Sequence, residues 1–372
     1  MLKVAIVGCG KIADDHAQQI RRVRLGNLVA FCDAEPLMAQ QMRDRFGGDA
    51  YNSVAELLAR ARPDVVHITT PPQSHFPLAM ECLEANCHVF VEKPFTMNVG
   101  EAERLLGAAA SRHLKVSVDH NLQFTEPALR LRALVADGFL GGPPVHLESY
   151  YCYDLSDPGY ARSFLSDSAH WVRRLPGGLL QNIISHGIAR IAEHVKSEDP
   201  GVTALGRTSP MLRSLGEQRL RDELRVLVHD DTTTAYFTFS SQMRPQVSEL
   251  RIFGHRNALL LDDNHHLLVK LHGDKYKSYL DMVVPPLNVS RGFFANAARN
   301  VRSLVTGRLH MSEGMKELIE RFYRSIVDDG PVPIPYREIV LTSRIMDSVF
   351  AQLGTVREVP QDRAATAAAS AG

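Results

Sequence analysis

A glycine-rich segment directly after the first apolar run constrains the fold of this chain more than any other feature. The run Val4–Val7 is followed by Gly8-Cys9-Gly10-Lys11-Ile12-Ala13, which opens a helical stretch. In a G-x-G-x-x-A arrangement, Gly8 permits a tight turn, Gly10 lets a diphosphate approach the backbone, and Ala13 lets helix and strand pack closely. The diphosphate would lie on the unpaired N–H groups at the helix start. The segment therefore predicts a dinucleotide-binding unit.

An acidic residue at the end of the second apolar run supports this interpretation. Asp33 follows Leu28–Cys32, about 20 residues after Ala13, where a carboxylate can accept hydrogen bonds from ribose hydroxyls. NAD is favoured over NADP as the cofactor, because Asp33 would repel a 2′-phosphate and Ala34, not an arginine, follows it. The alternative is a glycine turn that binds no ligand.

The first third of the chain alternates short apolar runs with helical patterns. The runs are Val4–Val7, Leu28–Cys32, Val65–Ile68, His88–Val91 and Lys115–Val118. Continuous apolar runs are typical of parallel strands that are buried on both faces. Their alternation with helices predicts an α/β fold, with residues 1–124 forming an NAD-binding Rossmann domain built on a doubly wound parallel sheet.

After about residue 124 the pattern changes to strands with one apolar face. In Thr234–Phe239, Ala235, Phe237 and Phe239 share one face and polar residues share the other. Helices are expected at Ala128–Ala136, Leu179–Val195, Phe293–Leu304, Glu313–Ile326 and Ile339–Leu353. This predicts an α+β domain over 125–360, with a mostly antiparallel sheet that helices cover on one face. Residues 361–372 are expected to form a disordered tail.

Composition excludes several classes of function. The chain has 372 residues, with 42 Lys+Arg against 42 Asp+Glu, so bulk electrostatics does not favour nucleic acid or an anionic membrane as partner. No apolar run reaches the roughly 18 residues of a membrane helix. Five cysteines without paired spacing predict reduced thiols and a cytoplasmic location. We expect no metal site, because Asp262–His266 has the character of a polar hairpin tip.

Several ordered motifs resemble the Gfo/Idh/MocA oxidoreductases, the glucose–fructose oxidoreductase and inositol dehydrogenase-like family. They are the glycine segment with His16 after it, Thr69–His75, Glu92-Lys93-Pro94, Asp119–Phe124, and Gly177-Gly178 with His186. The resemblance spans nearly the whole chain. It implies a Rossmann domain, an open-faced sheet domain that mediates oligomerisation, and an active site between them that acts on sugars, cyclitols or nucleotide sugars. A homodimer or homotetramer is expected.

The resemblance also implies roles for individual residues. Lys93 takes the position of the family's catalytic lysine, with Glu92 and Pro94 fixing the end of that strand. Thr69, Pro71, Gln73 and His75 match the family's loop that runs past the nicotinamide ribose. His120 and Asn121 match positions that line the nicotinamide pocket. His75 could equally cap a helix or pack locally. Independently of the family, a lysine beside a dinucleotide site can bind a substrate hydroxyl and help lower its pKa; the alternative is a surface lysine.

One helix departs from the family pattern. Where members often show D-x-G-x-H, this chain has Asn182, Ile184 and His186. Residues four apart share a helix face, so Asn182 and His186 would both face the cleft. Asparagine can orient a hydroxyl but cannot take its proton, so His186 becomes the leading general base, with an ordinary pKa of about 6.5. The alternative is a helix histidine that only packs.

These features predict an NAD-dependent oxidoreductase that transfers a hydride between nicotinamide and a secondary alcohol of a sugar or nucleotide sugar. Lys93, His186 and Asn182 would form its catalytic site. Two alternatives remain: a non-catalytic NAD- and sugar-binding sensor, suggested by Asn182, and an NAD-dependent lyase or glycosidase without net redox change. Several aromatic and basic residues precede Gly177-Gly178. They either shape a sugar pocket or only pack in the fold: Tyr150, Tyr151, Tyr153, Arg162, His170, Trp171 and Arg173.

Overall fold

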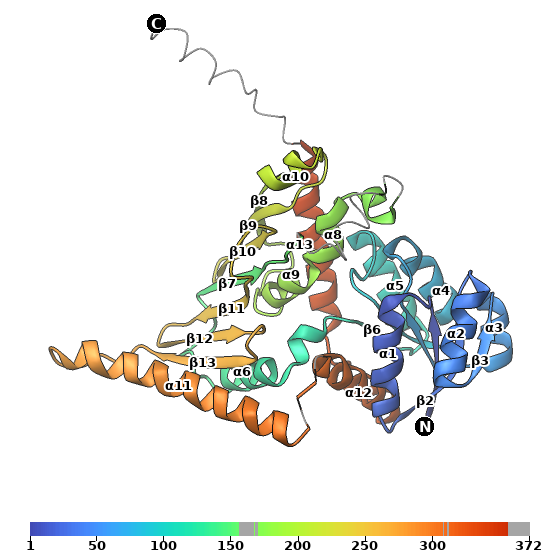
Figure 1. The fold of residues 1–372 in the computed structure, drawn as a ribbon, viewed down its shortest axis with the longest axis horizontal. Helices are drawn as coiled ribbons and strands as arrows, with labels where there is room; N and C mark the ends of the chain where they lie inside the picture. Colours follow the sequence, from blue (N-terminus) through green and yellow to red (C-terminus); the bar gives the residue numbers. More distant parts are fainter. Residues whose placement is uncertain (156–166, 168–169, 308, 311, 356–372) are drawn as a thin grey trace, which may run out of the picture.

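The computed structural model describes residues 1–155, 167, 170–307, 309–310 and 312–355, and the expected tail, 361–372, lies outside them. Two sheets organise the chain, and helix α13 (Tyr336–Thr355) runs between them (Figure 1). This helix packs against α5 (Val99–Ser111) of the first domain and against α9 (Ser185–Ala192) of the second. It therefore ties the two halves of the molecule together.

The first sheet is six-stranded and parallel, in the order β3-β2-β1-β4-β5-β6. Its strands are β1 (Leu2–Val7), β2 (Gly26–Cys32), β3 (Asp49–Tyr51), β4 (Val65–Ile68), β5 (His88–Val91) and β6 (Val116–Val118). The helices between them are α1 (Lys11–Arg22), α2 (Pro36–Phe46), α3 (Val54–Ala61), α4 (His75–Glu84) and α5. The strand order reverses between β1 and β4, where doubly wound sheets bind ligands. The predicted Rossmann arrangement is confirmed.

Helix α12 (Glu313–Val327) returns to the first sheet late in the chain. Its buried residues Met315, Leu318, Phe322 and Tyr323 belong to the core of the first domain. A Cβ on Gly314 would lie 2.3 Å from the carbonyl oxygen of Asn121, so the helix approaches the short 3₁₀ helix η2 (Asn121–Phe124) very closely. A domain boundary at residue 124 would place α12 in the second domain, but the apolar face of this helix packs into the hydrophobic core of the first domain.

The second sheet has seven strands in the order β13-β12-β11-β7-β10-β9-β8. They are β7 (His146–Tyr151), β8 (Gly201–Arg207), β9 (Glu223–His229), β10 (Thr234–Ser240), β11 (Ser248–Phe253), β12 (Asn257–Asp262) and β13 (Leu267–His272). All neighbours are antiparallel except β7 and β10, which run parallel. The predicted mostly antiparallel sheet is confirmed, and the hairpin tip predicted at Asp262–His266 joins β12 to β13.

Helices cover one face of this sheet, and in the described part of the chain the other face is covered only along β13, where a Cβ on Gly292 would lie 3.3 Å from Val269 Cγ1. The helices of this half are α6 (Glu126–Ala136), α8 (Gly178–Ile183), α9, α10 (Pro210–Ser214), α11 (Leu280–Val305) and α13, with short 3₁₀ helices η1 (Pro72–Ser74) and η3 (Trp171–Arg174) elsewhere. Helices α6, α9 and α13 pack on the sheet. The alternation in β10 follows this arrangement, since Phe237 is fully buried whereas Tyr236 is 52% exposed. No helix in the described ranges could cross a membrane.

Candidate active site

The glycine turn lies at the carboxyl end of β1, beside the point where the strand order reverses. Gly8 has a φ of +93°, and a Cβ there would lie 2.6 Å from Thr70 Cγ2, so a side chain would be both strained and obstructed. A Cβ on Gly10 would meet no atom within 4 Å. Helix α1 starts here with Lys11, Ile12 and Ala13, and no side chain caps it. Its first N–H groups therefore face open space that suits a diphosphate.

A cavity of about 460 Å³ runs along this edge of the sheet. Among its lining residues are the predicted cofactor residues Gly8, Gly10, Asp33, Thr69 and Pro71. Asp33 also holds the glycine turn, a role that the sequence interpretation missed, because its Oδ2 accepts a hydrogen bond from the Cys9 N–H at 2.6 Å. A carboxylate oxygen can accept more than one hydrogen bond, so ribose hydroxyls can still bind Asp33. The residues present fit a dinucleotide.

Two of the cofactor residues predicted in the loop Thr69–His75, His75 and Gln73, do not line this cavity. His75 is fully buried, with Nδ1 2.9 Å from the Pro94 carbonyl oxygen and Nε2 2.8 Å from that of Thr70. Burial lowers the pKa of His75, although its backbone hydrogen bonds oppose this. The ring thus has the packing role that was the alternative for it. Gln73 Nε2 donates to the Trp171 carbonyl oxygen at 3.3 Å and so connects the two domains.

Lys93 follows β5 and reaches across to the second domain. Its Nζ donates to the backbone carbonyl oxygen of Asn182 at 3.1 Å, and its N–H donates to Glu92 Oε2 at 3.0 Å. In a continuous helix, the Asn182 carbonyl would accept from the N–H of His186. The structure instead separates α8 from α9 at Ile184. The predicted single helix Leu179–Val195 is therefore wrong, and the interruption coincides with the contact to Lys93.

His186 lies in α9 and is only 7% exposed. Its ring centroid is 6.1 Å from that of His120 and 5.7 Å from that of Tyr151. Burial, the charge of Lys93 and the neighbouring His120 lower the pKa of His186 well below its usual value, so the imidazole is neutral. Its Nδ1 is buried with no hydrogen-bond partner among the described residues, which is unusual for a structural histidine.

His120 and Asn121 lie on the first domain's side of the same site. Burial lowers the pKa of His120 to about 3, and the charge of Lys93 acts in the same direction. Its Nε2 is also buried without a partner in the described part of the chain. Asn121 Nδ2 donates to Asp119 Oδ2 at 3.0 Å. The structure therefore brings together Lys93, His120, Asn182 and His186, while Asn121 is directed at a buried carboxyl group. Arg162, considered for a sugar pocket, lies outside the described residues.

A chain of buried side chains lies behind Glu92, and the sequence interpretation missed it. The Tyr323 hydroxyl is 2.8 Å from His67 Nε2, His67 Nδ1 is 2.9 Å from His16 Nδ1, and His16 Nε2 is 2.9 Å from Glu92 Oε1. Burial acts to raise the pKa of Glu92, but the hydrogen bond and charge of His16 and the charge of Lys93 lower it. Glu92 therefore accepts a hydrogen bond from His16 Nε2, and the chain of contacts joins the end of β5 to Tyr323 of α12.

Asp119 extends this chain on the other side of Glu92. Burial and the charge of Glu92 raise the pKa of Asp119 well above its usual value, because two carboxyl groups this close disfavour a second negative charge. The possible ligand atoms of His16, Glu92 and Asp119 lie within 4.8 Å of one another. The hydrogen bonds between these groups account for their close approach. The result is a fully buried polar support directly beneath Lys93.

Comparison with known proteins places the first domain in a family. Residues 2–120 match the model GFO_IDH_MocA, described as an oxidoreductase family with an NAD-binding Rossmann fold. D-glucoside 3-dehydrogenase from Escherichia coli K12 is 32% identical over 142 residues, covering 38% of this chain and 40% of that protein. UDP-N-acetylglucosamine 3-dehydrogenase from Acidithiobacillus ferrooxidans is 32% identical over 148 residues, covering 40% and 44%. The chain thus matches less than half the length of either relative.

Solved structures extend the likeness in fold to the second domain. The WlbA dehydrogenase from Bordetella pertussis, solved in complex with NADH and UDP-GlcNAcA, aligns with a TM-score of 0.75 and 16% identity. The alignment covers 97% of this chain and 98% of that one. Residues 2–120 therefore match the Gfo/Idh/MocA oxidoreductase family with its NAD-binding Rossmann fold, and the whole chain shares its fold with the WlbA dehydrogenase.

Proposed function

We propose that this chain is an NAD-dependent dehydrogenase for a secondary alcohol of a sugar or nucleotide sugar. The observation that carries the proposal is the convergence of Lys93 and a neutral, buried His186 at the junction of the two domains. The two curated relatives, named as dehydrogenases of a glucoside and of UDP-N-acetylglucosamine, support this substrate class. NAD, when bound, would accept or supply the hydride at its nicotinamide ring.

His186 is the proposed proton acceptor. Because its imidazole is neutral, one ring nitrogen carries no proton and can accept that of a substrate hydroxyl. The positive charge of Lys93 favours the deprotonated form of a nearby hydroxyl and so lowers its pKa. Asn182 can hold a hydroxyl but cannot take its proton. Proton transfer in this proposal therefore depends on His186, with Lys93 stabilising the developing negative charge.

We propose NAD, not NADP, as the cofactor. Asp33 and Ala34 both line the cavity beside the glycine turn, and none of its described lining residues is basic. A 2′-phosphate placed there would meet a carboxylate and no compensating cation, which is unfavourable in a partly buried site. Asp33 with a ribose carrying two free hydroxyls avoids this repulsion.

We also propose that a second copy of the chain covers the open face of the second sheet, in a homodimer or homotetramer. This face exposes Tyr236 and, at the sheet edge, Leu205, which is 64% exposed. Between the strands it carries the ion pair Glu148–Arg251 at 3.5 Å. Tyr236→Asp should shift the protein toward monomers in sedimentation experiments.

All five cysteines are free and buried, which supports the predicted cytoplasmic location.

The test of the dehydrogenase proposal uses Lys93→Ala and His186→Ala. The purified protein is screened with sugars and nucleotide sugars by the appearance or loss of NADH absorbance. Each variant should lose at least about 100-fold in kcat, the scale of a lost acid–base group, while NAD affinity measured by calorimetry stays the same. His265→Ala, in the exposed hairpin tip, is the control. Full activity in both variants would contradict the proposal.

The same screen separates the alternatives. Sugar binding in the wild type without any change in NADH absorbance would favour the sensor that Asn182 suggests. Product formation that requires NAD but leaves no net NADH would favour a lyase or glycosidase. Either result would replace the dehydrogenase proposal.

A further inference from the structure

A second cavity, of about 410 Å³, opens where the start of α8, the segment before β9 and the end of α13 meet. Figure 1 shows α8, α10 and the end of α13 at the same end of the second sheet. The volume is in the range of small-molecule sites. Its lining includes four arginines, Arg173, Arg174, Arg219 and Arg221, together with Phe350 and Leu353. We call this cavity the arginine pocket.

The positive charge of the arginine pocket is largely uncompensated. No carboxylate is among its described lining residues, although the whole chain has as many acidic as basic residues. Arg173 pairs with Glu217 Oε2 at 2.7 Å. For Arg174, Arg219 and Arg221, the guanidinium groups have no hydrogen bond or ion pair within the described ranges. Three cations therefore face the cavity without a partner from this part of the chain.

Both carboxylate oxygens of one neighbouring acid, Glu217, are already engaged. It is 8% exposed, and its Oε1 accepts from the N–H groups of Arg219 at 2.7 Å and Leu220 at 3.0 Å. Burial acts to raise the pKa of Glu217, but these two hydrogen bonds and Arg173 lower it. The carboxylate thus fixes the segment that presents Arg219, and it neutralises Arg173 alone.

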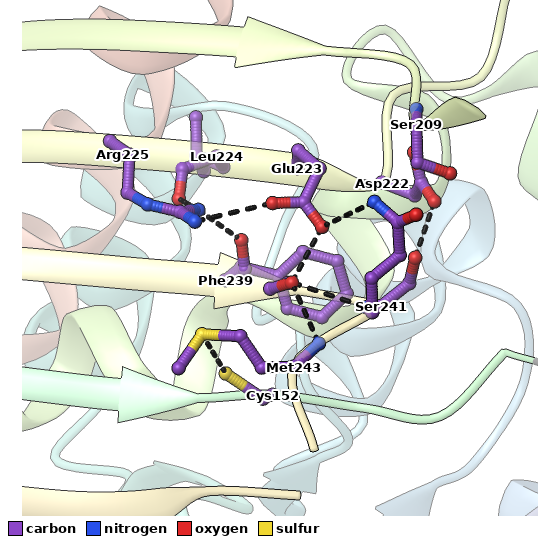
Figure 2. A network of polar contacts seen from close by, with 11 residues as sticks. Cys152, Ser209, Asp222, Glu223, Leu224, Arg225, Phe239, Ser241 and Met243 are labelled. Carbon is purple, nitrogen blue, oxygen red and sulfur yellow. Dashed lines mark hydrogen bonds and ion pairs between the residues drawn. The ribbon is translucent and has the colours of Figure 1, made fainter. Parts of the chain in front are cut away.

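Asp222 and Glu223, which follow Arg221 in sequence, form hydrogen bonds in a separate buried network. Asp222 accepts from the Ser209 N–H at 2.6 Å and from the Ser241 hydroxyl, and Glu223 accepts from Arg225 at 3.2 Å. Figure 2 shows these contacts together between β9 and β10. Asp222 is fully buried and Glu223 is 4% exposed. Neither lines the arginine pocket, so neither cancels its charge.

The rest of the pocket wall is apolar and closely packed. A Cβ on Gly177 would lie 2.5 Å from a ring carbon of Phe350, so the chain before α8 rests directly on that ring. A Cβ on Gly206 would lie 2.6 Å from Leu353 Cδ2. The lining of the pocket therefore combines closely packed apolar side chains with arginines, an arrangement that suits a ligand with one anionic and one less polar part.

We propose that the arginine pocket binds a phosphate-bearing anion, with its oxygens on Arg174, Arg219 and Arg221 and its less polar part against Phe350 and Leu353. Guanidinium groups stay charged at physiological pH and match phosphate oxygens with paired N–H donors. This proposal does not require the chain to be a dehydrogenase. The diphosphate of a nucleotide-sugar substrate and a free phosphorylated metabolite offer the same chemistry.

Binding of inorganic pyrophosphate to the full chain tests the proposal. Calorimetric titrations are made with NADH at saturation, so that the diphosphate position at the glycine turn is already filled. Arg174→Ala/Arg219→Ala removes two exposed arginines without disturbing the core. Affinity should fall at least about tenfold, and added salt should weaken wild-type binding. Arg213→Ala, an exposed arginine of α10 outside the pocket, is the matched control and should bind normally.

Two results would overturn the proposal: no saturable pyrophosphate binding by the wild type, or equal affinity in the double variant and the wild type. Near-UV circular dichroism of each variant confirms that its fold is intact. Lys93→Ala should still bind pyrophosphate, so failure of the dehydrogenase proposal and failure of this one give different results.

The source of the phosphate is identified by a second pair of measurements. If the pocket holds the diphosphate of a substrate, UDP displaces pyrophosphate, and the double variant shows a raised KM for nucleotide sugars with little change in kcat. If it holds a free phosphorylated metabolite, pyrophosphate binds the wild type while the KM for substrate is the same in both proteins. Both results support an anion site and differ only in its occupant.

Discussion

Tyr323→Phe tests the buried chain of hydrogen bonds that ends at Glu92. The substitution removes only the hydroxyl that lies 2.8 Å from His67 Nε2. The ring stays packed on β2, where a Cβ on Gly26 would lie 2.6 Å from Tyr323 Cε2. Any loss of stability therefore reports the hydrogen bond and not a cavity. It also reports how firmly α12 is joined to the N-terminal sheet, because Tyr323 and His67 are 256 positions apart.

The magnitude follows from the burial of both partners. Tyr323 and His67 are fully buried, so water cannot replace the lost hydroxyl at His67 Nε2. Leaving a buried polar group unpaired costs about 1–3 kcal/mol, and we expect the free energy of unfolding to fall by that amount. Tyr279→Phe is the control, because Tyr279 is 81% exposed and surface changes of this kind stay within about 0.5 kcal/mol.

Urea unfolding followed by circular dichroism measures the effect. The midpoint should fall in Tyr323→Phe while the dependence on urea concentration stays the same, because the surface exposed on unfolding is unchanged. If Tyr323→Phe is as stable as Tyr279→Phe, the hydroxyl does not act as a buried partner of His67.

Three further changes have definite expected results. Burial lowers the folded-state pKa values of His67, His120 and His186, whereas unfolded histidines titrate near about 6.5. Below that pH the unfolded chain therefore takes up more protons than the folded chain, and the thermal midpoint should fall between pH 7 and pH 5. A midpoint that rises over this range would contradict the prediction. Gly8→Ala, at a φ of +93°, should weaken NADH binding at least about tenfold in a fluorescence titration; unchanged affinity would contradict the proposed turn. Asp33→Ser should raise the ratio of kcat/KM for NADP to that for NAD, and a constant ratio would show that Asp33 does not face the ribose.

The first domain could be predicted well because its strands are buried on both faces. Such strands leave continuous apolar runs, and each run that was identified, such as Val65–Ile68, became a strand of the parallel sheet. The missing strand, Asp49–Tyr51, has only three residues and lies at the sheet edge with no fully buried side chain. Its pairing comes from its neighbour β2, and its own sequence carries no periodic signal.

Predictions failed where distant contacts override a local pattern. The helix predicted over Leu179–Val195 is interrupted beside the contact between Lys93 and Asn182, which are 89 positions apart. Helix α11 begins at Leu280 and not at Phe293, and it contains Pro285 and Pro286. Proline disfavours a helix interior, so the prediction placed the start of this helix too late in the chain. The sequence could predict that Gly8, Gly10 and Asp33 lie together at one edge of the sheet, because the spacing of these residues reflects that geometry.

The contacts of Asn182 change how its departure from the family pattern is interpreted. Lys93 binds its backbone carbonyl, so this contact does not depend on whether the side chain is an amide or an acid. An aspartate here would add a carboxylate four residues from His186, and a nearby negative charge raises the pKa of a histidine. With asparagine, burial and the positive charge of Lys93 keep His186 neutral. The departure from the family pattern thus removes one proton acceptor and, at the same time, favours the form of His186 that can act as the other.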